Sequence, residues 1–332
     1  MIPPKNNPIQ VGALGNARIL KRAISALEHL ENIKLTAIAS GSISKDEALI
    51  FKNSKIKVYS EYEELLKDPD IQIIYICLPT GLHYEWALRA LHEKKHVVVE
   101  KPAVMNVIEA QDLLNYANQN NLQVIEAWWY RFHPLVQELK VMLNKNSLGK
   151  IHFISSNFSY VNANANDWRW KKALGGGALF DMFSYHVDLL GYIMCIKNQD
   201  IEFIQAFASL KQLVDANLYA ELKTFSGVTG HFMAGIDRVS SCQTVILGEL
   251  GSFVIPQLQI LPEMNSSEIN HFSSNGAVRY SYPQIDAYYL MWESLNIFFQ
   301  GQINNPMPFE QSIQNMVILK RIEQCLLGSS YH

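Results

Sequence analysis

Lys101 could take part in proton transfer. It lies in the tripeptide Glu100-Lys101-Pro102, which follows a short apolar run at residues 96–99. An ammonium group lowers the pKa of a neighbouring acid and can orient a substrate oxygen. At the carboxyl end of a strand in an open α/β sheet, such a side chain points into the crevice where these folds bind ligands. Lys-Pro after a strand is also ordinary loop sequence, so the chemistry of Lys101 depends on the elements around it.

A glycine-bearing turn, Gly15-Asn16-Ala17-Arg18-Ile19-Leu20, lies between an apolar stretch at 9–14 and a helical pattern at 18–30. Dinucleotide-binding turns have Gly-x-Gly-x-x-Gly or Ala, and only the first glycine, which makes the tight turn, is present here. A single glycine at this place is also an ordinary βα turn. In the context of the fold predicted below, it indicates a pyrophosphate site at the first amides of the Arg18 helix.

The end of the second predicted strand, residues 35–39, bears on the choice of cofactor. An acid there binds the ribose hydroxyls and excludes a 2′-phosphate. Here the strand is followed by Ser40-Gly41-Ser42, with Lys45 nearby and no acid. This slightly favours NADP over NAD, with Ser40, Ser42 and Lys45 as phosphate partners, although the same residues also suit a turn and a helix cap.

Strand and helix patterns alternate through the first part of the chain, which predicts a doubly wound parallel sheet, an α/β Rossmann domain over residues 1–127. Ser44 and Ser60, each followed by Glu three residues on, predict helix starts. The predicted strands are 9–14, 35–39, one at Val58, 71–78, 96–99 and 122–127, and the predicted helices include 18–30, 83–91 and 106–118.

The pattern changes after about residue 150. Strand-like segments with few helices between them predict an α+β domain, residues 128–332, with a large, mostly antiparallel open sheet. The segments are 151–160, 204–210, 220–225, 228–234, 244–247 and 252–255, followed by helices at 285–299 and 309–327. We expect this domain to bind substrate and to form oligomers, and its last helix to pack back on the first domain.

Composition excludes several classes of partner. Charge is nearly balanced, with 28 Lys and Arg against 31 Asp and Glu, which gives no footprint for nucleic acid or an anionic membrane. No apolar run is long enough to span a bilayer. The N-terminus lacks an apolar signal region, and the four cysteines form no C-x-x-C pair. We therefore expect a cytoplasmic protein that binds a small molecule and has no metal site.

Several further motifs, taken in order with Lys101 and the cofactor turn, resemble those of the Gfo/Idh/MocA family, in the branch with dimeric dihydrodiol dehydrogenase, aldose dehydrogenases and nucleotide-sugar ketoreductases. Pro79-Thr80 with His83 is similar to the family's Pro-Asn-x-x-His turn. The other motifs are Glu126-Ala127-Trp128-Trp129-Tyr130-Arg131-Phe132-His133-Pro134, Trp168-Arg169 and Gly175-Gly176-Gly177-Ala178-Leu179-Phe180-Asp181. The resemblance extends over nearly the whole chain.

The resemblance implies an NAD(P)-dependent oxidoreductase that interconverts a hydroxyl and a carbonyl on a sugar, nucleotide sugar or related cyclic polyol. Lys101 matches the catalytic lysine, Tyr185 the proton donor or acceptor, and Asp181 a residue that orients substrate hydroxyls or Lys101. A homodimer or tetramer formed through the second sheet is implied too. The implied cofactor contacts are Gly15, Asn16, Ala17, Arg18, Ser40, Ser42, Lys45, Leu78, Pro79, Thr80, His83, Glu100, Lys101 and Arg169.

Two neighbours of Tyr185 leave questions open. His186 titrates near neutrality without help and is the alternative proton carrier. If residues 179–190 form an α-helix, Asp181 and Tyr185 share a face while His186 points about 100 degrees away, which favours Tyr185. Phe183 stands at the glycine position of the family pattern, where it could narrow the substrate pocket.

Alternatives remain at this stage for the activity and for the glycine run. The same fold could serve a non-catalytic protein that senses a dinucleotide or sugar. An enzyme could instead act on a non-sugar carbonyl or a trans-dihydrodiol. Gly175-Gly176-Gly177 suits either a flexible loop or close approach of the backbone to a ligand.

Overall fold

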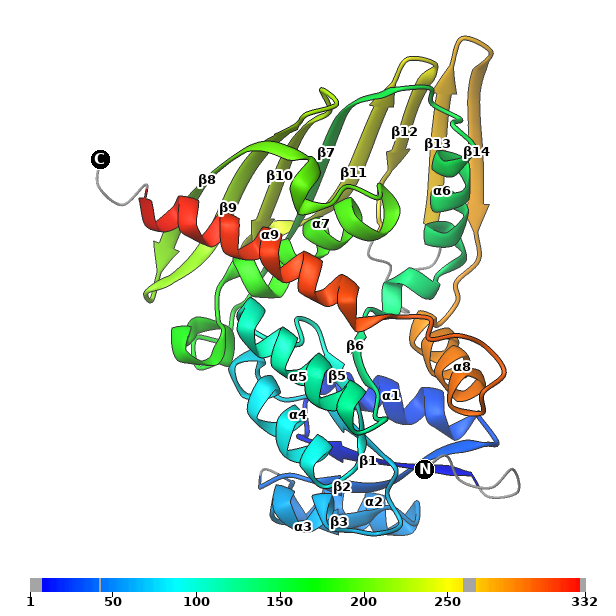
Figure 1. The fold of residues 1–332 in the computed structure, drawn as a ribbon, viewed down its shortest axis with the longest axis vertical. Coiled ribbons are helices and arrows are strands. Elements are labelled where there is room, and N and C mark those ends of the chain that lie inside the picture. The colour runs from blue at the N-terminus through cyan, green and yellow to red at the C-terminus, as the bar shows by residue number, and fades with distance from the viewer. Residues whose placement is uncertain (1–7, 42, 259–266, 329–332) are drawn as a thin grey trace. The chain divides into compact units, whose positions relative to one another are not determined.

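The structure is a computed structural model that describes residues 8–41, 43–258 and 267–328 (Figure 1). Its described residues fall into two compact units, one within Met1–Trp129 and Tyr288–Ser312, the other within Tyr130–Ala287 and Ile313–His332. The predicted boundary between residues 127 and 128 stays a prediction, as does the packing of the last helix on the first domain.

The first unit contains the predicted doubly wound sheet, which is confirmed. Six parallel strands lie in the order β3-β2-β1-β4-β5-β6. The strands are β1 (Ile9–Leu14), β2 (Ile33–Ala39), β3 (Lys57–Tyr59), β4 (Ile73–Ile76), β5 (His96–Glu100) and β6 (Val124–Ala127). Every residue of β4 and β5 is buried, as expected for strands covered on both faces.

Helices α1 (Arg18–Glu28), α2 (Lys45–Asn53), α3 (Tyr62–Leu66), α4 (His83–His92) and α5 (Val107–Gln119) connect these strands. The capping box at Ser44 is confirmed, because the Ser44 amide donates to Glu47 Oε2 at 3.0 Å and the Glu47 amide donates to Ser44 Oγ at 3.2 Å. The predicted cap at Ser60 is wrong. Helix α3 begins after Glu61, which makes no side-chain cap.

Strands β1 and β4 are neighbours, so the strand order reverses between them. Ligands of open α/β sheets bind beside the carboxyl ends of the strands at this switch point. Gly15 follows β1, Leu78 follows β4 and Lys101 follows β5. The fold therefore brings the two predicted cofactor segments and the lysine to one edge of the sheet.

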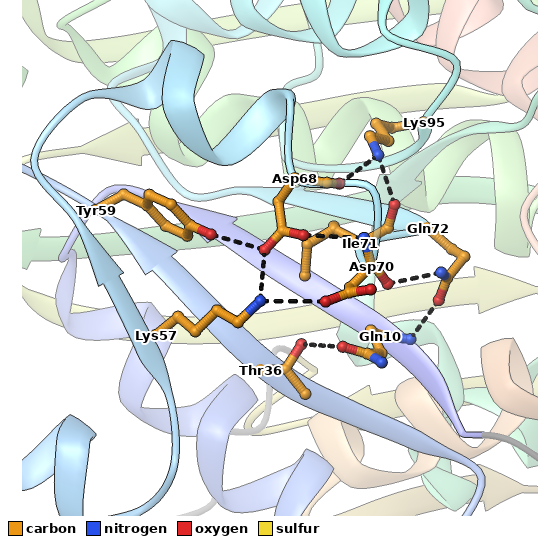
Figure 2. A network of polar contacts seen from close by, with 9 residues as sticks. All are labelled: Gln10, Thr36, Lys57, Tyr59, Asp68, Asp70, Ile71, Gln72 and Lys95. Carbon is orange, nitrogen blue, oxygen red and sulfur yellow. Dashed lines mark hydrogen bonds and ion pairs between the residues drawn. The ribbon is translucent and has the colours of Figure 1, made fainter.

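A polar network fixes the opposite edge, where β4 and β5 begin (Figure 2). The buried Asp68 carboxylate accepts from Tyr59 Oη at 2.7 Å and from Lys57 Nζ at 3.1 Å. Lys95 Nζ donates to the carbonyl oxygens of Asp68 and Ile71 at 2.7 and 2.8 Å. The network joins β3 to the loops that precede β4 and β5.

Helix α8 (Ala287–Phe299) belongs to the first unit, although all strands of the second sheet lie between β6 and α8 in the sequence. Trp292 packs edge-on against Tyr75 of β4 at 5.5 Å between ring centroids, and Tyr288 stacks on Trp129 at 5.1 Å. Sequence reasoning predicted the helix but gave no indication of this packing.

The second unit contains an eight-stranded sheet in the order β14-β13-β12-β11-β7-β10-β9-β8. Only the β7–β10 pair is parallel among its described ladders, which confirms the mostly antiparallel sheet. The strands are β7 (Ile151–Val161), β8 (Ile201–Lys211), β9 (Val214–Thr224), β10 (Thr229–Gly235), β11 (Asp237–Gly248), β12 (Gly251–Ile255), β13 (Ser267–Ser273) and β14 (Gly276–Tyr282). The last two were not predicted.

Helices cover one face of this sheet, including α6 (Pro134–Asn144) and α9 (Phe309–Gly328) (Figure 1). The predicted helix at 179–190 has three parts: a π-helical segment η5 (Leu179–Phe183), helix α7 (Ser184–Asp188) and a second π-helical segment η6 (Leu189–Ile193). The α-helical spacing assumed for Asp181 and Tyr185 therefore does not hold, because the segment that carries Asp181 is wound more widely.

Candidate active site

Gly15 adopts a conformation that requires glycine, with φ of 102°. A Cβ at this position would lie 2.9 Å from Leu78 Cδ2 and 3.0 Å from the Cys77 carbonyl oxygen. The Gly15 amide also donates to the Ala39 carbonyl at 2.9 Å. The turn after β1 is thus held against the ends of both neighbouring strands, β2 and β4.

The start of helix α1 fits a dinucleotide pyrophosphate. Ala17 is its N-cap and makes no side-chain cap, and the first turn contains no acidic residue. Amides at a helix start lack partners within the helix and carry a partial positive charge, so they favour an anion. The predicted contacts at Gly15, Ala17 and Arg18 are therefore suitable in type and place, and their binding role stays a prediction.

The region beside β2 is only partly described. Ser40 is buried, whereas Ser42 and the Lys45 side chain lie outside the described residues. Asn16 Nδ2 donates to Glu47 Oε1 at 3.3 Å. Hydrogen bonds from the Ser44 amide, Asn16 and the Ser44 hydroxyl hold the pKa of Glu47 below its usual value. Sequence reasoning missed this carboxylate beside the turn, although the Ser44-Glu47 spacing was its signal.

His83 braces the loops that follow β4 and β5. Its Nδ1 lies 2.8 Å from the Pro102 carbonyl oxygen and its Nε2 lies 2.8 Å from that of Leu78, within the predicted Leu78-Pro79-Thr80 turn. Burial lowers the pKa of the ring. His83 therefore joins the Leu78-Pro79-Thr80 turn to the segment that carries Lys101. These contacts suit a residue that positions the two loops rather than one that transfers a proton.

Glu100, the residue before the lysine, is buried at the end of β5. Its Oε1 accepts from Tyr75 Oη at 2.7 Å and from Tyr288 Oη at 3.5 Å. Burial raises the pKa of Glu100 to about 6. The Ala103 amide donates to Glu126 Oε1 at 2.8 Å. These contacts fix the backbone on both sides of Lys101.

In the second unit, Asp181 is the centre of a hydrogen-bonded cluster. Its Oδ2 accepts from Tyr160 Oη at 2.9 Å and from Arg169 Nε at 2.7 Å. The guanidinium of Arg169 stacks over the Trp168 ring at 4.5 Å and reaches Asp167 at 3.3 Å. A carboxylate, a phenol and a guanidinium at one place supply the donors and acceptors that recognise the hydroxyls of a polyol.

Tyr185 lies between two aromatic rings of the second unit. The Tyr130 ring packs edge-on at 5.5 Å and the Phe158 ring at 5.2 Å. Tyr130 Oη donates to Asp188 Oδ2 at 2.5 Å. The buried Asp188 carboxylate also pairs with Arg131. This buried pair anchors Tyr130 and, through its ring, limits the position of the Tyr185 ring.

His186 lies in an enclosed and largely apolar environment. It is fully buried, with Nε2 2.9 Å from the Met233 carbonyl oxygen, and the rings of Phe183 and Phe232 lie 5.2 and 5.6 Å away. Burial lowers the pKa of its imidazole to about 4. Phe183 is buried and packs on His186 and Phe232, and the expectation that it narrows the substrate pocket stays a prediction.

The glycine run after Trp168-Arg169 is packed against the protein itself. A Cβ on Gly176 would lie 2.4 Å from the Arg169 carbonyl oxygen, and one on Gly177 would lie 2.0 Å from Asp215 Oδ1. Gly177 also has φ of 110°. Both glycines are therefore required by contacts within the second unit, which disfavours a flexible loop, and close approach of the backbone to a ligand stays a prediction.

In residues 8–41, 43–258 and 267–328, no three His, Cys, Asp or Glu side chains are grouped to hold a metal ion. No helix in the same ranges combines the length and hydropathy needed to cross a membrane.

Two family models match the chain. The model described as "Oxidoreductase family, NAD-binding Rossmann fold" matches residues 9–127. The model described as "GFO/IDH/MocA C-terminal domain" matches residues 136–254. The first match spans β1 to β6, and the second begins in α6 and ends in β12.

Individual relatives are similar over most of the chain. A dTDP-3,4-didehydro-2,6-dideoxy-alpha-D-glucose 3-reductase from Actinomadura kijaniata is 28% identical over 93% of this chain and 92% of its own length. A trans-1,2-dihydrobenzene-1,2-diol dehydrogenase from Xenopus laevis is 29% identical over 76% of each chain. The crystal structure of a 3-ketoreductase from Actinomadura kijaniata with NADP and TDP-benzene superposes with a TM-score of 0.88, at 25% identity over 96% of this chain and 98% of that one.

Proposed function

Because this chain belongs to the Gfo/Idh/MocA family of NAD(P)-dependent oxidoreductases, we propose that it interconverts a hydroxyl and a carbonyl on a sugar, nucleotide sugar or related cyclic polyol. The observation that carries the substrate class is the Asp181 cluster with Tyr160 and Arg169. The similarity to a nucleotide-sugar reductase supports it.

Cofactor binding is assigned to the first unit. The Gly15 turn, the start of α1 and the Leu78–His83 segment would hold an NADP molecule at the carboxyl edge of the sheet, and the bound nicotinamide supplies the hydride chemistry. NADP is favoured over NAD because β2 ends without an acid and the similar 3-ketoreductase was solved with NADP.

Proton transfer is assigned to Tyr185 with Lys101. In the reducing direction, Tyr185 Oη donates its proton to the substrate oxygen as hydride reaches the carbonyl carbon; in oxidation both steps run in reverse. A phenol has a pKa near 10, and the Lys101 ammonium would stabilise its anion. The burial and low pKa of His186 support Tyr185 over His186.

Substrate orientation is assigned to Asp181 and Arg169. Both side chains offer charge-assisted hydrogen bonds, which are stronger than those between neutral groups. Tyr160 holds the same Asp181 oxygen as Arg169, so the carboxylate keeps one orientation. For hydride transfer, the protein must hold the substrate carbon that carries the hydroxyl or carbonyl in line with the nicotinamide.

The test begins with cofactor binding, measured as the fluorescence of NADPH and NADH titrated with purified protein. Turnover is then measured with free aldoses, dTDP-linked keto sugars and trans-dihydrodiols. We expect tighter binding of NADPH and turnover of at least one sugar substrate. Turnover confined to dihydrodiols would refute the sugar class, and tight binding without any turnover would favour the sensing alternative.

The catalytic assignment is tested by Lys101→Met, which removes the ammonium and keeps most of the unbranched side chain. We expect kcat to fall by about 100-fold or more, in the range that general acid–base groups contribute. NADPH affinity should change little. Near-normal turnover would refute the role of Lys101.

The oligomer is proposed to form through the second sheet, with a second copy of this chain as the occupant. Apolar side chains are exposed on strands of this sheet, and Phe207 lies directly opposite Tyr219. We expect a dimer by light scattering, and a monomer after Phe207→Lys, with Ile108→Lys on the first unit as an unchanged control. A monomeric wild-type protein would refute this proposal. The cytoplasmic location stays a prediction.

A further inference from the structure

We propose that Asp215 is a positioning residue for this reaction: from strand β9, its carboxylate docks the turn that carries Asp181 and thereby sets the geometry of the substrate-orienting cluster. This inference rests on the proposed function, because that function makes Asp181 and Arg169 the residues that orient substrate. Neither the resemblance nor the sequence motifs pointed to Asp215.

The contact between Asp215 and the turn is close on both of its oxygens. Oδ2 accepts from the Leu179 amide at 2.6 Å. Oδ1 lies against Gly177, where a Cβ would approach to 2.0 Å. Only a residue without a side chain can bring its backbone this near to the carboxylate, so Gly177 and Asp215 form a matched pair.

The carboxylate serves as a helix cap supplied from another element. Segment η5 begins after Ala178, which makes no side-chain cap hydrogen bond. The first amides of a helix lack partners within the helix, and an anion near them is stabilising. Asp215 therefore replaces the missing cap from near the start of β9, a strand that is hydrogen-bonded to β8 on one side and β10 on the other.

The docked turn connects to both members of the Asp181–Arg169 ion pair. The Asp181 amide donates to the Gly177 carbonyl at 3.4 Å, and the Gly177 amide donates to the Arg169 carbonyl at 2.9 Å. The two side chains then meet at 2.7 Å. A shift of Gly177 would move both partners, so the position of Asp215 is transmitted to the whole cluster.

Burial of Asp215 disfavours its charged form. Burial raises the pKa of its carboxyl to about 6, and the Leu179 amide opposes that change. Lys172 and Glu323 are the charged groups that act on it, with opposite signs. Within the part of the chain that the structure describes, Asp215 makes no ion pair, so its burial is better explained by the turn it holds than by the stability of the sheet.

The experiment compares Asp215→Ala, Asp215→Asn and, as a matched control on the neighbouring strand, Glu202→Ala. The alanine variant should lower kcat/KM by about 10-fold to 100-fold, in line with the cost of misplacing a substrate-orienting group. Asparagine keeps an oxygen that can accept from Leu179, so it should restore kcat/KM to within about threefold of wild type. NADPH affinity should be unchanged in all three variants.

Hydrogen–deuterium exchange supplies a readout that does not depend on activity. Peptides spanning residues 177–185 should exchange faster in Asp215→Ala and remain protected in Asp215→Asn. If wild type turns over no substrate, the proposed function fails while the exchange result still decides the role of Asp215. Unchanged exchange in this segment, or wild-type kcat/KM in the alanine variant, would overturn the inference. Asp215→Ser replaces the alanine variant if that variant does not fold.

Discussion

The contrast between Tyr185→Phe and His186→Gln tests which side chain moves the proton. Phenylalanine removes only the hydroxyl and keeps both edge-on contacts of the ring, with Tyr130 and Phe158. Glutamine places an amide nitrogen near the position of His186 Nε2, where it can still donate to the Met233 carbonyl. Each substitution therefore removes one chemical property and preserves most of the packing.

The two substitutions should affect different quantities, kcat for Tyr185→Phe and the free energy of unfolding for His186→Gln. Loss of a general acid–base group costs about 100-fold to 10,000-fold in rate, which is roughly 3 to 5 kcal/mol of barrier. For Tyr185→Phe we expect a fall of this size in kcat. His186→Gln should keep kcat within about threefold and lose roughly 1 to 2 kcal/mol of stability, through weaker hydrogen bonding and ring packing.

A dependence on pH gives a second signature. Burial lowers the pKa of His186 from 6.5 to about 4, so between these values the unfolded chain binds the proton more tightly than the folded protein. Wild type should therefore lose stability as pH falls from about 6.5 to 4, by on the order of 3 kcal/mol from this residue. His186→Gln should lack that part of the decline.

The assays are steady-state turnover at saturating NADPH and urea unfolding at pH 7 and pH 4.5. If a folded His186→Gln variant loses turnover while Tyr185→Phe retains it, the assignment of the proton to Tyr185 is refuted. The same result would mean that the imidazole leaves its buried place during the reaction.

Three further predictions concern the rest of the molecule. Gly15→Ala should weaken NADPH binding by about 10-fold in fluorescence titration, because its φ of 102° costs a side-chain-bearing residue about 1 to 3 kcal/mol; unchanged affinity would exclude the turn from the cofactor site. Asp68→Ala should lower the free energy of urea unfolding by about 1 to 3 kcal/mol, since the hydrogen bonds that Tyr59 and the half-exposed Lys57 donate to the buried Asp68 carboxylate are lost; a smaller change would show that water replaces the carboxylate. Burial raises the pKa of Asp215 from 3.8 to about 6, so the folded state binds the proton more tightly than the unfolded chain. Wild type should therefore lose stability relative to Asp215→Asn as pH rises from about 4 to 6. A stability difference that does not change with pH would contradict the raised pKa of this carboxyl.

The first sheet was predictable because its strands carry their own signal. Strand β4 is a continuous apolar run and β5 contains three consecutive valines, as is typical of buried parallel strands. The capping box at Ser44 is equally local. By contrast, β13 and β14 were missed because their residues are mainly polar and partly exposed, so neither alternation nor an apolar run marks them.

The surroundings of the candidate site were less predictable, because they depend on contacts between distant segments. The core position of Phe183 is set by Phe232 on β10, and the need for glycine at position 177 is set by Asp215 on β9. The choice between Tyr185 and His186 likewise depends on the surroundings of His186, which Phe183 and Phe232 enclose. A motif names the residue types of a site, and only the packing of other elements decides their roles.

The return of α8 to the first unit has a consequence for the order of synthesis. The ribosome completes β1 to β6 long before it reaches Trp292, which packs on the fully buried Tyr75 of β4. Until then, the ring of Tyr75 lacks this cover, and the entire second sheet emerges in the meantime. The dinucleotide-binding unit therefore reaches its final packing only near the end of translation. In a fragment that ends at residue 129, the surface of Tyr75 that Trp292 covers would stay exposed.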